Sequence, residues 1–163
     1  MILIPKSPTA DTRTCDVSKV SKDELYRSSH QHINDVRRAL TFFGWLLQDA
    51  AQRHDYDKLT DIDGFYADFQ TKFTQTTWWD RHRQLNRHHL LQPDGVPADV
   101  NLIDVLDLIA DCVMAGTARS GSVYALTITP DVLQRAFDNT VALLISNVGV
   151  IPEPGAASDG SPR

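Results

Sequence analysis

The chain has 163 residues, of which 16 are Lys or Arg and 21 are Asp or Glu, giving a formal net charge of −5 at pH 7. This length predicts one domain that buries well over half of its unfolded surface, and it leaves no room for a second. The negative charge argues against a protein that binds long nucleic acid, because the phosphate backbone attracts clustered cations. It still allows a small anionic ligand, since a metal ion and a few cations can dominate locally.

The first predicted helix begins near residue 21. Residues 1–20 are polar and lack periodicity, so they predict a flexible N-terminal arm. Ser21 and Glu24 have the spacing of a capping box, with a hydroxyl at the N-cap and a carboxylate three residues later. From residue 25 to residue 47 the apolar side chains recur every three or four positions, which predicts a helix that contains His32.

Several shorter helices are predicted after it. The pair His54-Asp55 opens or ends a helical segment, residues 61–73 form an amphipathic stretch, and residues 78–91 predict a third helix. An apolar helix over residues 100–115 follows, with Asp99 as its predicted N-cap. Thr129-Pro130 predicts the start of the last helix, which extends to about residue 148.

The remaining pattern indicates the fold class and the compartment. No alternating strand pattern extends beyond a short stretch at residues 123–128, so we predict an all-α domain over residues 21–149. Residues 150–163 are rich in Pro, Gly, Ala and Ser and predict a disordered tail. The sequence has no signal-peptide pattern and no apolar run of membrane-spanning length. Cys15 and Cys112 favour reduced thiols over a disulfide, so we expect a cytoplasmic protein without membrane contact.

Four side chains predict a divalent-metal site assembled between helices: His32, His54, Asp55 and Asp111. Imidazole nitrogen and carboxylate oxygen suit Zn, Mn, Fe or Co, and four protein ligands on a six-coordinate ion leave positions open for water and substrate. Asp111 lies in an apolar helix, where an unpaired carboxylate is costly, so we expect it to contact a cation. Asp104 and Asp107 lie on nearly the same helix face and remain alternatives to it.

A second group of histidines follows the His-Asp pair. His82 and His89 are seven residues apart, which is about 10 Å along a helix axis, so both can bind one ion only if the helix bends. We therefore expect a second metal ion at His82 and His89 or contact between this group and a substrate phosphate, with a structural role for these histidines as the remaining alternative. His88 and His89, together with the flanking Arg87, are the predicted substrate contacts.

Two residues after the His-Asp pair are candidates for catalysis. Lys58 follows His54 by four residues, which places both on one side of a helix, so its ammonium group is a candidate contact for a phosphate. Asp57, or another nearby carboxylate, is a candidate for orienting a metal-bound water. His82 is the third predicted catalytic residue, because a histidine near the metal can stabilise developing charge.

Five segments carry a resemblance to a known family: His32-Ile33-Asn34, His54-Asp55-Tyr56-Asp57-Lys58-Leu59, Asn86-Arg87-His88-His89, Asn101-Leu102-Ile103-Asp104 and Asp111-Cys112. They resemble the HD-domain superfamily of metal-dependent phosphohydrolases, and more narrowly a group of short phage-borne and bacterial HD-like proteins. The resemblance covers about half of the chain. It implies an HD-like bundle of about five to seven helices, in which extra histidines after the pair hold a second metal in related enzymes. The chain departs from the pattern at Asp107 and Val113, where the family leads us to expect Glu and Trp.

The resemblance implies a metal-dependent phosphohydrolase that acts on a small phosphorylated substrate, with a nucleotide as the best single expectation. Metal-activated water would be the nucleophile, with one ion or two. Two alternatives stay open. Some HD proteins with a His-Asp-x-x-Lys segment hold two irons and activate dioxygen, and a phage protein of this kind can also bind a nucleotide or a partner without catalysis. Such a phage protein would act in the host cytoplasm, and a homo-oligomer is compatible with all three.

Overall fold

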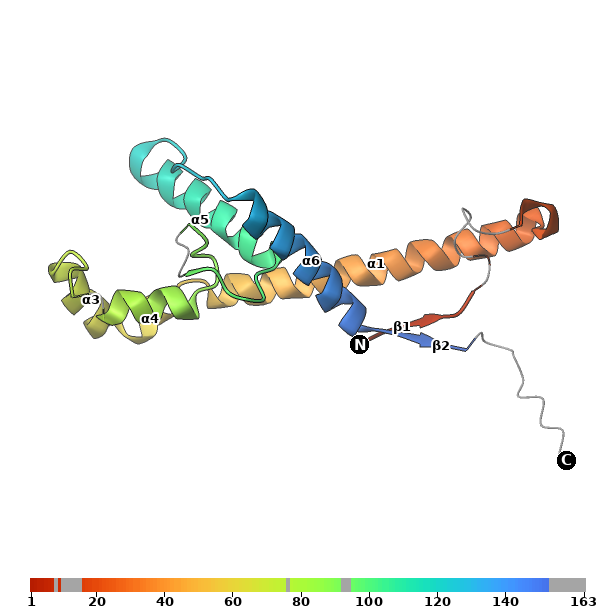
Figure 1. Cartoon of the computed structure of the whole chain (residues 1–163), viewed down its shortest axis with the longest axis horizontal. Helices are drawn as coiled ribbons and strands as arrows, with labels where there is room; N and C mark the ends of the chain where they lie inside the picture. The colour runs from red at the N-terminus through yellow and green to blue at the C-terminus, as the bar shows by residue number, and fades with distance from the viewer. Residues whose placement is uncertain (8, 10–15, 76, 92–94, 153–163) are drawn as a thin grey trace, which may run out of the picture. The chain divides into compact units, whose positions relative to one another are not determined.

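A computed structural model describes residues 1–7, 9, 16–75, 77–91 and 95–152 of the chain. Helices dominate these residues, so the predicted all-α class is confirmed. In chain order the elements are β1 (Ile2–Pro5), the short 3-10 helix η1 (Val17–Lys19), α1 (Lys22–Arg53), α2 (Asp57–Thr60), α3 (Ile62–Gln70), α4 (Thr77–Leu85), α5 (Leu102–Ser120), α6 (Pro130–Ser146) and β2 (Val148–Ile151) (Figure 1). The chain divides into two compact units, residues 1–42 with 143–163 and residues 43–142.

The first unit contains the N-terminal part of α1 and a two-stranded parallel sheet. Ser21 and Glu24 form the predicted capping box, because the Glu24 N–H donates to Ser21 Oγ at 3.2 Å and the Ser21 N–H donates to Glu24 Oε2 at 2.8 Å. β1 pairs with β2 in the register Ile2 to Val148, and Gln31 of α1 donates to the Pro5 carbonyl at 2.7 Å. The helix therefore holds the strand pair through its polar side chains.

These two strands correct two sequence-based boundaries. The predicted flexible arm, residues 1–20, contains β1 and η1, and the predicted disordered tail starts at residue 150, inside β2. Each strand has four residues, which is too short for an alternating pattern to be distinguished from irregular sequence. Most of the predicted tail, and Cys15, lie outside the described residues. Cys112 is buried as a free thiol.

The second unit has its apolar core between α5 and α6. Seven buried side chains form this core: Leu90, Val100, Val105, Leu108, Cys112, Val132 and Ala136. α5 begins at Leu102, two residues later than predicted, because Asn101 and not Asp99 is its N-cap. Asn101 Oδ1 accepts the Ile103 N–H at 2.9 Å, and Asp104 Oδ2 accepts the Asn101 N–H at 2.9 Å, which completes a capping box. α6 begins at Pro130, as Thr129-Pro130 predicts.

A glycine lets the chain after α5 pass close to the helix. A Cβ atom at Gly116 would lie 2.5 Å from the Ser122 carbonyl oxygen and 2.6 Å from the Tyr124 nitrogen, and both are backbone atoms that cannot rotate away. We predict that Gly116→Ala lowers the free energy of unfolding by about 1–3 kcal/mol, because overpacking outweighs the better helix propensity of alanine. Gly44→Ala on α1 is the control, since nothing lies within 4 Å of a Cβ there. Urea unfolding measures both, and a Gly116→Ala protein as stable as wild type would contradict the prediction.

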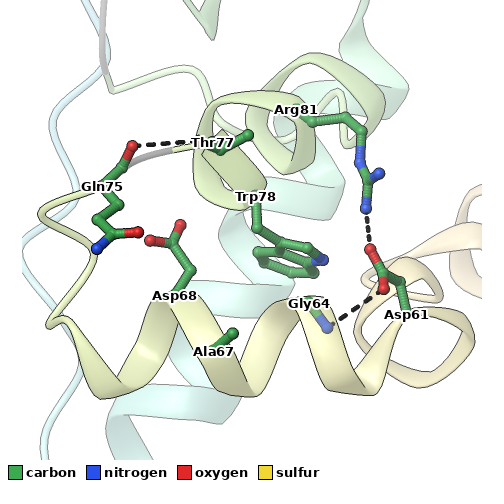
Figure 2. A pocket seen from close by; sticks show the side chains of 8 residues that line it. All are labelled: Asp61, Gly64, Ala67, Asp68, Gln75, Thr77, Trp78 and Arg81. Atoms are coloured by element: carbon green, nitrogen blue, oxygen red, sulfur yellow. Dashed lines mark hydrogen bonds and ion pairs between the residues drawn. The ribbon is translucent and has the colours of Figure 1, made fainter.

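α3 and α4 pack through aromatic side chains and enclose a small pocket. Trp78 of α4 stacks near Phe65 of α3 with ring centroids 4.6 Å apart, and the buried Asp68 of α3 accepts the Trp79 N–H at 3.0 Å. Figure 2 shows the pocket between these helices, of about 260 Å³, with the Trp78 ring above Gly64 and Ala67 of α3. Within the ranges that the structure describes, no helix is both long and apolar enough to cross a membrane.

The helix predicted over residues 78–91 is shorter in the structure. α4 ends at Leu85, and residues 86–91 form turns and irregular backbone. The bend changes the relation between His82 and His89, whose ring centroids are only 4.8 Å apart. The bend that the sequence required for both rings to reach one ion is therefore present, and the separation of about 10 Å on a straight helix does not apply.

Candidate metal centre

The candidate centre is built where α1 ends. Asp55 follows this helix with a φ of 55°, in the left-handed region that side chains other than glycine seldom adopt, although Asp and Asn tolerate it best. Its N–H donates to Asn86 Oδ1 at 2.9 Å, which fixes this unusual backbone conformation. The turn directs the chain into α2 and leaves the Asp55 carboxylate facing the histidines that follow α4.

Two groups of possible metal-ligating side chains share this carboxylate. The first is His54, Asp55 and His88, and the second is Asp55, His82 and His89; in each group the ligand atoms lie within 4.8 Å of one another. All five residues belong to the second unit. Because a carboxylate has two oxygens, Asp55 can contact one cation in each group.

Three distances from Asp55 to the histidines are close to the spacing that a small divalent cation needs. Two atoms bound at about 2.0–2.1 Å to one tetrahedral ion are about 3.4 Å apart. His82 Nε2 lies 3.3 Å from Asp55 Oδ1, and His54 Nε2 lies 3.5 Å from Asp55 Oδ2. His88 Nε2 lies 3.7 Å from Asp55 Oδ1. The side chains therefore need only small shifts to share a cation.

Carboxylates behind the rings fix the orientation of these histidines. Asp57 Oδ2 accepts from His82 Nδ1 at 2.8 Å, and Asp107 Oδ1 accepts from His54 Nδ1 at 2.8 Å. Asp107 Oδ2 also lies 3.6 Å from His88 Nδ1. A carboxylate on Nδ1 holds the proton there and leaves the Nε2 lone pair free for a metal ion, as is usual for metal-bound histidine.

Three atoms of the second group are buried and lack hydrogen-bond partners among the described residues: Asp55 Oδ1, His82 Nε2 and His89 Nε2. Unpaired buried polar atoms are rare because each costs free energy. Burial lowers the pKa of His82 in spite of the Asp57 hydrogen bond, and burial with the neighbouring His88 and His82 lowers the pKa of His89 to about 3. Both rings are thus neutral near pH 7, the form that binds metal.

The other side of Asp55 is occupied by a lysine. Lys58 Nζ donates to Asp55 Oδ2 and lies 5.9 Å from the centre of the Phe65 ring. Burial would raise the pKa of Asp55, but the hydrogen bond and the charge of Lys58 lower it below its usual value. Burial would likewise raise the pKa of Asp107, but His88 and His54 lower it. Asp55 and Asp107 are therefore ionised near neutral pH.

Two of the four predicted ligands, His54 and Asp55, are in the groups. Asp111 lies beside the first group, with Oδ1 3.8 Å from His54 Nε2, while Asp107, the alternative that the sequence left open, holds the His54 ring from behind. His32 is in neither group: it is an exposed residue of α1 in the first unit. His32 and His54 therefore belong to different units, and His32 as a metal ligand stays a prediction.

Arg87 and Asp57, predicted for substrate and water, have structural partners. Arg87 Nε and Nη2 donate to the two oxygens of Asp104 at 2.8 and 2.9 Å, and Nη1 donates to Asp99 at 3.1 Å. The Asp104 hydrogen bond raises the pKa of Arg87. Asp57 contacts His82 and accepts from Asn86 Nδ2 at 2.9 Å. Arg87 thus ties the segment after α4 to the start of α5, and Asp57 orients a histidine.

We predict that Arg87→Met lowers stability without changing metal binding. Asp104 is buried, so the loss of its bidentate partner should lower the free energy of unfolding by about 1–3 kcal/mol, after allowance for the partial exposure of Arg87. Arg81→Met is the matched control, because Arg81 pairs with Asp61 at the surface and should contribute little to stability. Chemical unfolding and metal titration measure the two effects. Unchanged stability with weakened substrate binding would instead support the substrate role.

The sequence did not single out Asn86 as a site residue, nor a positioning role for Asp107. Asn86 is only 6% exposed and contacts three parts of the centre: the Asp55 N–H, Asp57 Oδ1 and the His82 carbonyl, to which its Nδ2 donates at 3.1 Å. Asn86 could have been identified from the sequence, since it belongs to the segment Asn86-Arg87-His88-His89, which carries part of the family resemblance. No family model matches the chain, and no curated protein and no solved structure matches it either.

Proposed function

We propose that the protein is a metal-dependent phosphohydrolase of the HD type that acts on a small phosphorylated molecule. The observation that carries the proposal is the single carboxylate, Asp55, shared by two histidine groups whose spacing suits divalent cations. Two cations a few ångströms apart are typical of enzymes that cleave phosphate esters and anhydrides. Zn, Mn, Fe and Co all suit this donor set, since imidazole and carboxylate are their common ligands.

The residues of the centre have two roles in this proposal: some would bind the cations, and others orient the histidines. Asp55, His54 and His88 would hold one cation, and Asp55, His82 and His89 the other. When bound, the cations would lower the pKa of a water ligand and neutralise charge on the phosphoryl oxygens. Asp107 would keep the proton of His54 on Nδ1, and Asp57 that of His82, away from the cations.

Two partly exposed groups beside the cluster suit the substrate and the water. Lys58 carries the positive charge closest to Asp55 and can contact a phosphate oxygen. Asp111 is 32% exposed and lies 3.8 Å from His54 Nε2, so its carboxylate can accept a proton from the attacking water. This assignment replaces Asp57, whose oxygens already accept from His82 and Asn86. A nucleotide is our first choice of substrate because it combines phosphate with a ring that an exposed aromatic side chain such as Tyr56, next to Asp55, can contact.

One feature favours a second candidate, a di-iron oxygenase: four histidines and one shared carboxylate also suit two iron ions. A protein that binds a nucleotide without cleaving it is the third possibility that the same site allows. The test separates the three. Protein freed of metal and reloaded with Mn²⁺ or Co²⁺ is incubated with nucleoside mono-, di- and triphosphates, and released phosphate and pyrophosphate are measured.

We expect release that requires metal and disappears in Asp55→Asn. Release that survives complete removal of metal would contradict a metal-dependent mechanism. Dioxygen consumption by the iron-loaded protein, with no phosphate release from any nucleotide, would favour the oxygenase. Tight nucleotide binding with the ligand recovered intact would favour the binding protein.

A further inference from the structure

The two oxygens of Asp55 have different surroundings. Oδ1 is buried without a hydrogen-bond partner among the described residues, and it lies 3.3 Å from His82 Nε2 and 3.7 Å from His88 Nε2. Oδ2 accepts a hydrogen bond from Lys58 Nζ and lies 3.5 Å from His54 Nε2. An ammonium group therefore occupies the side of the carboxylate that faces His54, while the side that faces His82 is open to a cation.

Lys58 is placed to leave this position without disturbing the fold. It lies in the four-residue helix α2, three positions after Asp55, and its side chain is 31% exposed. Its other neighbour is the face of Phe65, which attracts an ammonium weakly. Only side-chain torsions need to change for Nζ to move toward solvent. By contrast, His82 is fully buried and fixed by Asp57.

We propose that Lys58 is a tethered cation that sets the order of metal binding and couples it to phosphate binding. The first ion binds Asp55 Oδ1, His82 and His89, whose atoms are unpaired among the residues that the structure describes. The second ion binds with His54 and His88 and displaces Lys58 from Oδ2, so that the ammonium becomes available to a phosphate. This inference rests on the proposed function, since it assigns a further property to the same centre.

The displacement has two measurable consequences. The second ion binds more weakly than the first, because it must replace an existing ion pair. Phosphate that accepts the released ammonium strengthens binding of the second ion, and the second ion strengthens phosphate binding by the same factor, because such coupling is reciprocal. Both effects require the positive charge of Lys58.

The test is a calorimetric titration of metal-free protein with Co²⁺, with visible absorption recorded in parallel, in the absence and presence of inorganic phosphate. We expect one tight and one weak event in the wild type, with phosphate strengthening only the weak one. Lys58→Met keeps the length of the side chain without its charge, and should strengthen the weak event by at least about tenfold and abolish the phosphate effect. His89→Gln should remove the tight event, and His54→Gln the weak one.

Two further variants make the result specific. Lys58→Arg keeps the charge and should retain the weak event and its response to phosphate. Lys22→Met removes the same charge from the exposed first turn of α1 and should behave as wild type. No Co²⁺ binding by the wild type would overturn the metal centre and the proposed function together. If the wild type shows two binding events while the association constant of the weaker event is unchanged or lowered in Lys58→Met, that result would overturn the role of Lys58 alone.

Discussion

Asp55→Asn is expected to remove both metal ions and all metal-dependent turnover. Asp55 is the one residue that belongs to both ligand groups found among the described residues, with Oδ1 3.3 Å from His82 Nε2 and Oδ2 3.5 Å from His54 Nε2. Asparagine has nearly the same shape but no negative charge, and its NH2 group would point a donor at one of the cations. We expect affinity for each ion to fall at least about 100-fold, more than is usual for residues that only orient a ligand.

The control for this variant is Asp80→Asn, which makes the same chemical change at a surface ion pair with Arg83 on α4. Metal content after dialysis, measured by mass spectrometry with inductively coupled plasma, gives the number of ions per chain. Two ions are expected in Asp80→Asn and none in Asp55→Asn. If Asp55→Asn keeps one tightly bound ion, Asp55 is not shared, and the centre must be assembled from other residues.

Asn86→Ala is expected to lower both stability and metal affinity. The amide of Asn86 accepts the Asp55 N–H, donates to Asp57 and donates to the His82 carbonyl, all in a buried position. Removing it leaves several buried polar groups without partners, which should lower the free energy of unfolding by about 2–4 kcal/mol. The left-handed backbone at Asp55 also loses its hydrogen bond, so metal affinity should fall about 10–100-fold, as for other residues that orient ligands.

Two variants separate positioning from simple destabilisation. Gln84→Ala removes an exposed amide from α4 and should leave both quantities unchanged. Asn86→Asp keeps the acceptor for the Asp55 N–H but places a second carboxylate beside Asp57, so it should retain the Asp55 backbone and lose the orientation of His82. The Co²⁺ absorption spectrum reports that change in coordination. A less stable Asn86→Ala protein with wild-type metal affinity and spectrum would show that Asn86 has only a structural role.

The sequence predicted those helix ends that depend only on residues within the adjoining turn. The capping box at Ser21 and Glu24 and the start of α6 at Pro130 depend on contacts within one turn of helix, and both were predicted from that turn. The end of α4 was not, because it depends on distant residues. Asn86 leaves the helix to bond Asp55 and Asp57, which precede it by about thirty positions, and such tertiary contacts override helix propensity.

For the site, too, the sequence predicted what depends on residue type and spacing, and not what depends on the tertiary structure. The His-Asp pair and the later histidines were identified by residue type and spacing, and the structure brings His54, Asp55, His82, His88 and His89 together. His32 was assigned from order along the chain; it lies in the first unit, outside both groups, and its role as a ligand stays a prediction. Asp107 and Asp111 lie one turn apart on the same face of α5, so the sequence could not decide which of them contacts the centre. In the structure Asp107 accepts from His54 Nδ1, and Asp111 lies near His54 Nε2.

Anomalous X-ray diffraction from crystals of the protein loaded with Mn²⁺ or Zn²⁺ tests the shared metal centre most directly, because it locates each ion without reference to activity. We expect two anomalous peaks about 3.5–4 Å apart on either side of the Asp55 carboxylate. One should lie beside His54 and His88, and the other beside His82 and His89. A single peak away from Asp55, or peaks held by His32 in place of these histidines, would contradict the shared centre.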